Sequence, residues 1–393
     1  MIYDAIVVGL GPAGSTAAYR LASEGLNVLA FDKEKFPRYK PCGGCISTKV
    51  EDVLGFDISG VIEDTVRGAV FTYKSGRTME ILSDRPVGYN VMRDRFDNLL
   101  VEKAREAGAE TIEGCRVTGL EETGDSVSVV TSHNETFKAK FLVGADGASG
   151  FVGRDYFGLD KREAAVSITA EVPSNGNLAH DVTGKLFIDF GLVPFGYGWI
   201  FPKKECLSVG MAGDIEKVRG KVKGYFSSFV KTHGLLKDME VSERTGWTVP
   251  IFYNPEFNAV KGRVLVAGDT GHLVDPFLGE GIYYAIHTAG AAADAIASCI
   301  RDGSADLSPY QKWLEREIYP EFRAAEKISS LVYKYPRLWY ALLEREPGIM
   351  LRYYDVIRGV ESGKSFYEWV FARIRSKPWK VLRGWVQSRF ISG

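Results

Sequence analysis

The chain begins with a short apolar strand that runs directly into three regularly spaced glycines. Residues 3–8 are followed by Gly9, Gly11 and Gly14 in the pattern Gly-x-Gly-x-x-Gly, and helix-like sequence occupies 15–24. Glycines at this spacing permit a tight turn, close approach of the backbone to a pyrophosphate, and close packing of the helix on the strand. The helix N-terminus then faces the anion. This order of elements predicts a dinucleotide-binding unit, to which an ordinary turn between strand and helix is the alternative.

Three later segments extend the prediction from a dinucleotide to FAD. An apolar strand at 27–31 ends in Asp32, which is placed to accept hydrogen bonds from a ribose hydroxyl. Far along the chain, a strand at 141–147 ends in Asp-Gly, and another at 263–269 ends in Gly-Asp before a glycine-rich turn and a long alanine-rich helix. Together these segments complete a flavin site, so we expect FAD rather than NAD.

The motifs resemble those of the flavoprotein group-A hydroxylase superfamily, and the segment 268–285 resembles its geranylgeranyl reductase family. The resemblance implies that Asp269 binds the ribityl chain and that the turn at 279–281 lies against the pyrimidine ring. Reduced flavin carries negative charge there, which backbone N–H groups at a helix start stabilise. The resemblance covers most of residues 1–300. The predicted FAD contacts are Gly9, Gly11, Pro12, Ala13, Gly14, Asp32, Lys33, Arg38, Cys42, Gly43, Gly44, Arg93, Val117, Asp146, Gly147, Gly268, Asp269, Gly279, Gly281 and Ile282.

Composition excludes several other classes of protein. The 393 residues include 49 Lys and Arg against 50 Asp and Glu, so no basic field attracts nucleic acid. The first apolar segment is short and carries the glycine motif, and no apolar run is long enough to span a bilayer. Five cysteines argue against a secreted disulfide framework, and five scattered histidines predict no metal site. We therefore expect a cytoplasmic protein.

The pattern of strands and helices predicts an α/β protein in three parts, with the fold of p-hydroxybenzoate hydroxylase. β-rich runs occur at 68–73, 77–82, 165–172, 185–190, 197–202 and 206–212. They predict one mainly antiparallel sheet, which is inserted into the Rossmann-like domain and binds the substrate. The predicted parts are an FAD-binding domain at 1–65, 92–162 and 255–300, a substrate-binding sheet domain at 66–91 and 163–254, and a C-terminal helical region at 301–393.

One strand of the inserted sheet carries an aromatic motif. Residues 197–203 match the Tyr-x-Trp-x-Phe-Pro-Lys pattern of geranylgeranyl reductases. Alternation along a strand places Tyr197, Trp199 and Phe201 on one face, where they form a wall suited to a long hydrocarbon. A sheet core is the alternative, because core strands also carry aromatic residues at every second position. The predicted substrate-binding residues are Tyr197, Trp199, Phe201, Pro202 and Phe277.

The segment after the second strand contains two cysteines close to the expected flavin. Pro41 to Gly44 match the family's Pro-Cys-Gly-Gly pattern, while Cys45 departs from it. Cys42 and Cys45 are candidates for a redox dithiol, although enzymes of that kind usually carry a second nucleotide motif that this chain lacks. Cys42 is alternatively a substrate-site residue and proton donor. The predicted catalytic residues are Cys42, Tyr197 and Trp199. Arg93 opens a helix at 93–107, either in contact with the cofactor or on the surface.

The resemblance implies an FAD-dependent reductase that saturates C=C bonds of a geranylgeranyl or other polyprenyl chain. A flavin monooxygenase or halogenase shares this fold, but halogenases carry Trp-x-Trp-x-Ile-Pro where this chain has Tyr197-x-Trp199-x-Phe201-Pro202. A lipid carrier that retains FAD is a third class. The electron donor stays open between ferredoxin, a small reductant and NAD(P)H. Basic and aromatic residues at 365–390 indicate either contact with a membrane surface or a helix packed on the enzyme.

Overall fold

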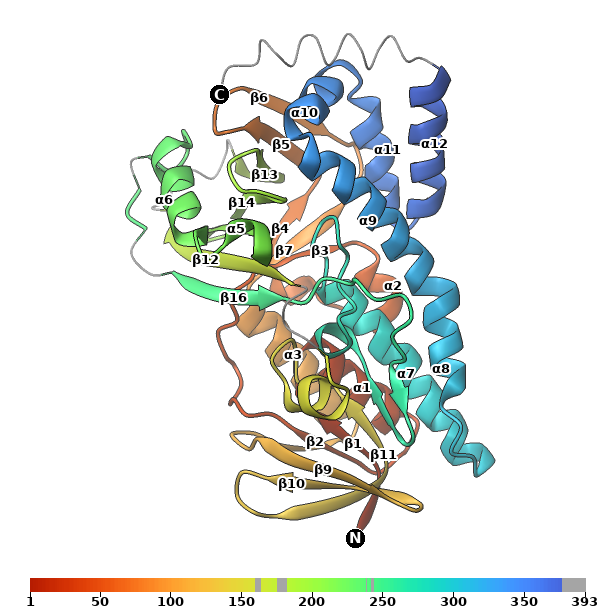
Figure 1. Ribbon diagram of the computed structural model, residues 1–393. Helices are drawn as coiled ribbons and strands as arrows, with labels where there is room; N and C mark the ends of the chain where they lie inside the picture. Colours follow the sequence, from red (N-terminus) through yellow and green to blue (C-terminus); the bar gives the residue numbers. More distant parts are fainter. Residues whose placement is uncertain (160–163, 175–181, 238, 242–243, 377–393) are drawn as a thin grey trace.

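The computed structural model describes residues 1–159, 164–174, 182–237, 239–241 and 244–376. Figure 1 shows a sheet at the N-terminal end of the molecule, a second sheet toward the opposite end, and the C-terminal helices along one side of both. This is the α/β flavoprotein architecture that the sequence predicts.

The first sheet is built around a central strand that is buried on both faces. Its order is β17-β18-β11-β1-β2-β8, parallel except for the pair β17 and β18. In β1, Ala5 to Val8 are all buried, as expected for a strand between parallel neighbours. The strands are β1 (Ile2–Val8), β2 (Val28–Phe31), β8 (Glu110–Ile112), β9 (Val117–Thr123), β10 (Ser126–Thr131), β11 (Thr136–Gly144), β17 (Val260–Lys261) and β18 (Val264–Val266).

Helices cover one side of this sheet, and the antiparallel pair β9 and β10 extends from β11 on the other (Figure 1). The helices are α1 (Pro12–Ser23), α3 (Arg93–Glu106) and α7 (Ile282–Asp302). Helix α1 has Pro12 at its first position, where a missing N–H costs nothing. The glycine motif therefore lies between β1 and α1, as predicted.

The second sheet has the order β16-β12-β15-β14-β13-β5-β6 and is antiparallel except for the pair β13 and β5. The predicted β-rich runs all fall on its strands. Helices α5 (Ile215–Val218) and α6 (Val222–Thr232) lie against one face. The strands are β5 (Gly68–Tyr73), β6 (Thr78–Leu82), β12 (Ala165–Pro173), β13 (Lys185–Phe190), β14 (Gly196–Pro202), β15 (Cys206–Asp214) and β16 (Thr245–Val249).

A small third sheet joins the two larger parts. Strand β7 (Gly88–Val91) pairs with β3 (Cys45–Ser47) and β4 (Ile62–Val66), and α2 (Val50–Leu54) follows β3. This sheet takes strands from both sides of the predicted boundary at residue 65, and the exact domain limits stay a prediction.

The C-terminal region is helical throughout the residues that can be placed. Its helices are α8 (Ser308–Trp313), α9 (Tyr319–Lys334), α10 (Pro336–Arg345), α11 (Gly348–Ile357) and α12 (Gly363–Ser376). Helices α9 to α11 pack on the face of the second sheet opposite α6. Within the described part of the chain, no helix is both long enough and apolar enough to cross a membrane. The predicted membrane-contact segment lies partly outside the described residues, which end at 376.

Candidate active site

A continuous cavity of about 1000 Å³ runs from the glycine motif to the C-terminal helices. We call its polar end, around Gly11, Asp32 and Arg38, the cofactor cradle. Its other end lies between the second sheet and α9 to α11. We call that end the apolar chamber, and its walls include Phe71, Leu186, Ile188, Val332, Leu343 and Ile349.

The cradle depends on glycines that no other residue can replace. Gly9 has φ +98°, and a Cβ added there would lie 2.3 Å from the carbonyl oxygen of Ala145. A Cβ at Gly14 would lie 1.7 Å from the carbonyl oxygen of Gly9. Strand and helix therefore approach closely, and α1 begins at Gly11 without a side-chain cap. Its first N–H groups stay available to an anion.

Two carboxylates fix the loops that border the cradle. Asp32 accepts hydrogen bonds from the N–H groups of Leu10 at 2.7 Å and Glu34 at 2.8 Å. Asp146 accepts from the N–H of Val152 at 3.0 Å, and Thr270 accepts from the N–H of Gly147 at 2.7 Å. Burial raises the pKa of Asp32, and it raises the pKa of Asp146 to about 6. Thr270 thus ties the ends of β11 and β18 together.

A group of cations lies over the cradle. Asp97, which is fully buried, pairs with Arg93 at 2.8 Å and with Arg38 at 3.0 Å. Arg93 is therefore no surface residue. The Nη1 atom of Arg38 is buried without a hydrogen-bond partner among the residues that can be placed. The Lys40 ammonium lies 3.6 Å from the centre of the Trp247 ring, and burial followed by repulsion from Arg93 lowers its pKa to about 7.

The Pro41–Gly44 segment is held from beneath by buried polar groups. The N–H of Gly44 donates to the Cys42 Sγ at 3.4 Å, and the Ser208 hydroxyl donates to the Cys42 carbonyl at 3.3 Å. Lys203 donates to the carbonyl of Val91 and leaves space only for glycine at position 44, where φ is +72°. The network fixes the backbone that carries Cys42 into the cavity.

All five cysteines are free thiols, so Cys42 and Cys45 form no disulfide. Burial raises the pKa of Cys45 to about 12. A thiol with that pKa stays protonated at neutral pH and is a poor nucleophile for disulfide exchange. This weighs against the predicted alternative of a flavin–dithiol enzyme.

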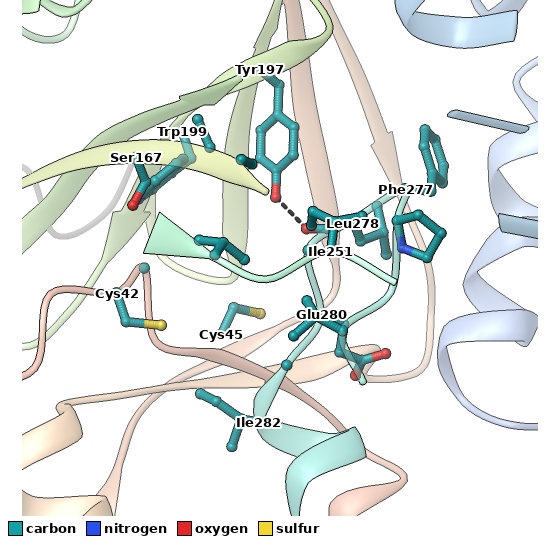
Figure 2. A pocket seen from close by; sticks show the side chains of 18 of the residues that line it. Cys42, Cys45, Ser167, Tyr197, Trp199, Ile251, Phe277, Leu278, Glu280 and Ile282 are labelled. Carbon is teal, nitrogen blue, oxygen red and sulfur yellow. Dashed lines mark hydrogen bonds between the residues drawn. The ribbon is translucent and has the colours of Figure 1, made fainter. Parts of the chain in front are cut away.

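The aromatic wall forms as predicted. The ring centres of Tyr197 and Trp199 lie 6.1 Å apart, and those of Trp199 and Phe201 lie 6.2 Å apart. All three line the cavity. The paired strand makes room for the indole with Gly210, because a Cβ there would lie 2.1 Å from the Trp199 ring. Figure 2 shows Tyr197 and Trp199 on one side of the pocket and Cys42 and Cys45 on another.

The loop between β18 and α7 ends in a tight turn at 275–280, which faces this wall. Asp275 accepts hydrogen bonds from the N–H groups of Phe277 at 2.8 Å and Leu278 at 2.7 Å, and burial raises its pKa to about 6. The Tyr197 hydroxyl donates to the carbonyl of Leu278 (Figure 2). Glu280 pairs with Lys49 at 3.4 Å. Helix α7 then begins at Gly281, without a side-chain cap.

The cavity brings together most of the predicted site residues. Outside its lining are Gly14, Val117, Pro202 and Gly268. Gly14 and Gly268 instead permit close packing of backbone and helix, whereas Val117 is buried in β9. For these positions direct ligand contact stays a prediction. Sequence reasoning missed Lys40, Asp275 and the chamber walls on α9 to α11. Lys40 stands beside the Pro-Cys-Gly-Gly pattern, which was the available signal.

Comparison with known proteins identifies the family. A model described as FAD binding domain matches residues 2–181. A geranylgeranyl diphosphate reductase of Rhodobacter capsulatus is 32% identical over 325 residues, which is 78% of each chain. The chain belongs to the geranylgeranyl reductase family. A digeranylgeranylglycerophospholipid reductase of Methanosarcina acetivorans is 30% identical over 80% of each chain. Among solved structures, a geranylgeranyl bacteriochlorophyll reductase-like protein of Thermoplasma acidophilum shares the fold, with a TM-score of 0.76 and 24% identity over 84% of this chain and 88% of that one.

FAD is the cofactor of this reductase-family protein, and the cradle fits it. The glycine turn and the uncapped start of α1 suit a pyrophosphate. Arg38 lines the cavity with a buried nitrogen that has no partner among the described residues, as expected for a donor to a bound anion. The start of α7 supplies N–H groups at the other end of the cradle.

Proposed function

We propose that this protein is an FAD-dependent reductase that saturates C=C bonds of a geranylgeranyl or related polyprenyl chain. The observation that carries the proposal is the continuity of the cavity, in which the cofactor cradle opens past the aromatic wall into the apolar chamber. The cavity lies at the upper end of the size range of ligand pockets, and walls of apolar side chains favour hydrocarbon over polar substrates. The names of the family's reductases agree with this substrate class.

Bound and reduced FAD supplies the hydride equivalent for such a reduction. The residues of this chain hold the alkene in place, because an isolated double bond is a poor electrophile and depends on positioning. Tyr197, Trp199 and Phe201 present a rigid wall on one side of the double bond. The Trp199 Nε1 is buried beside Gly43, with no hydrogen-bond partner in the described part of the molecule.

Cys42 is our candidate for the residue that delivers the proton to the second alkene carbon. Its Sγ accepts a hydrogen bond from the Gly44 N–H, and its side chain lines the cavity beside the aromatic wall. The other nearby acids are weaker candidates, since burial raises the pKa of Cys45 to about 12 and the Tyr197 hydroxyl is engaged by Leu278. Replacing Cys42 with alanine should slow prenyl reduction by about 10²-fold, the lower range for a lost general acid.

An anaerobic assay tests the function directly. The purified protein is reduced with dithionite, geranylgeranyl diphosphate is added, and flavin reoxidation is followed together with the mass of the lipid. We expect flavin oxidation with a gain of two hydrogens per step, and Cys115→Ala, a buried thiol away from the cavity, serves as the control for Cys42→Ala. Unchanged lipid with flavin that stays reduced until oxygen enters would instead favour the monooxygenase class.

A further inference from the structure

The turn at 275–280 is held from both sides by side chains far apart in the sequence. On its inner side, Asp275 accepts hydrogen bonds from the N–H groups of Phe277 and Leu278. On its outer side, two tyrosine hydroxyls donate to consecutive carbonyls, Tyr197 to Leu278 and Tyr333 to Phe277. The N–H groups and the carbonyl groups of Phe277 and Leu278 are thus all fixed by protein partners.

The two tyrosines belong to different parts of the fold. Tyr197 lies on β14 of the second sheet, and Tyr333 lies near the end of α9 in the C-terminal region. Their rings stack with centres 6.5 Å apart and an angle of 19° between planes. Phe277 packs between Tyr333, at 5.7 Å between ring centres, and Tyr353 of α11, at 5.4 Å. The turn is therefore held jointly by the second sheet and the C-terminal helices.

Both hydroxyls are partly buried at the wall of the cavity. Burial raises the pKa of Tyr333 well above its ordinary value and also raises that of Tyr197, so both act as neutral donors. A buried hydroxyl without a partner costs about 1–3 kcal/mol, which favours retention of both bonds.

The position of this turn sets where α7 begins. Gly279 to Ile282 line the cavity shared with the cradle, and a Cβ at Gly281 would lie 3.4 Å from an Asp269 carboxylate oxygen. The positive end of the α7 dipole therefore faces the cradle, where it would stabilise the negative charge of a bound, reduced flavin. We propose that Tyr333 is a positioning residue for the flavin, which acts from the C-terminal helices by fixing the carbonyl of Phe277 and hence the start of α7.

The chain offers a matched control for removal of a single hydroxyl group. Tyr354 is buried, lies on helix α11 and lines the same cavity. Its hydroxyl donates to the carbonyl of Ile81 at 2.8 Å and accepts from the N–H of Ala69 at 3.0 Å. It therefore contacts β5 and β6 and not the turn at 275–280. Tyr354→Phe removes a buried tyrosine hydrogen bond to a backbone carbonyl without touching the turn.

The experiment compares FAD-loaded wild-type protein, Tyr333→Phe and Tyr354→Phe without any lipid. We expect Tyr333→Phe to shift the flavin absorption spectrum and make the reduction potential more negative, because α7 is less well placed to stabilise reduced flavin. Tyr354→Phe should keep the wild-type potential, even where its thermal unfolding temperature falls as much. A wild-type potential in Tyr333→Phe, or an equal shift in both variants, would overturn the proposal. The assay contains no prenyl substrate, so its outcome is independent of the proposed reductase activity.

Discussion

Gly43 lies where the segment 36–44, which we call the cofactor segment, meets the aromatic wall. Its φ angle is outside the left-handed region, so backbone strain does not require glycine there. Space does, because an added Cβ would lie 2.6 Å from the Phe201 ring and 3.2 Å from the Trp199 Nε1. Both rings are buried and packed against each other, which leaves them little room to move.

Gly43→Ala should therefore push the cofactor segment and the wall apart. Overpacking of this kind costs about 1–3 kcal/mol, and we expect FAD affinity to fall by about tenfold or more. Fluorescence titration of the apoprotein with FAD measures the effect. Gly224→Ala, where the added Cβ meets none of the described residues within 4 Å, should bind FAD as the wild type does. Equal affinity in the two variants would show that the wall yields freely.

Single residues differ in how far sequence reveals their role. The sequence alone predicted the glycines before α1 and Asp32, because their spacing relative to one strand is a local property. Tyr333 and Asp275 were missed, since their partners are backbone atoms of a distant turn and no local pattern marks them. Lys203 is the last residue of the aromatic motif, but the motif does not predict its hydrogen bond to Val91, which lies 112 residues away in the sequence.

Helix α3 contributes one buried carboxylate for two guanidinium groups. Arg93 begins the helix, Asp97 follows one turn later, and Arg38 reaches Asp97 from the cofactor segment. The helix thereby anchors the segment that carries Cys42. Its amphipathic pattern predicted the helix and a buried face, but an aspartate on that face has no stable place without these partners.

Asp97→Asn should leave the two buried guanidinium groups without a compensating charge. Breaking a buried pair in this way costs about 3–5 kcal/mol of unfolding free energy. Urea denaturation of the variant and the wild type measures the loss. Glu102→Gln removes an exposed partner of Arg105 on the same helix, and it should cost no more than about 1 kcal/mol. Similar losses in both variants would contradict the role assigned to Asp97.

For the molecule as a whole, one buried imidazole should make stability depend on pH. His233 packs against Phe187 and Phe229, with ring centres 6.4 and 5.3 Å away, and burial lowers its pKa from 6.5 to about 4. Between about pH 4 and pH 6.5, this imidazole is protonated in the unfolded chain but neutral in the folded protein. Stability therefore rises with pH through this window and falls as the pH drops from about 6.5 to 4.

This histidine should account for up to about 3 kcal/mol of the acid loss in unfolding free energy. His233→Phe removes the titrating group while keeping an aromatic ring, so its unfolding free energy should fall less steeply between pH 6.5 and 4. Its absolute stability at pH 8 should be lower by about 1 kcal/mol, because the N–H of Leu235 loses its acceptor. Exposed His133 replaced by Asn should keep the wild-type slope, and an unchanged slope in His233→Phe would refute the assignment.

For the molecule as a whole, the sequence predicted the two large sheets and the helical C-terminal region. It did not predict the apolar chamber between the second sheet and α9 to α11. Alternation of apolar residues along the strands predicts which face of the second sheet is buried. The pattern of an amphipathic helix such as α9 also predicts a buried face, but it does not predict which surface covers that face. The third sheet was missed because β3 has only three residues, too few for a periodic pattern to be seen.

The cradle takes its walls from residues near 9, 146 and 281, and this separation governs how the protein is made. At about 5–20 residues per second, roughly 15 to 50 s of synthesis separate the first glycine turn from the start of α7. Within that interval, about 120 residues are added between the end of β11 and the start of β18, and until β18 is made the edge of β11 is open to pairing with other chains. FAD loading is consequently a late event, because the start of α7 is the last part of the cradle to be made.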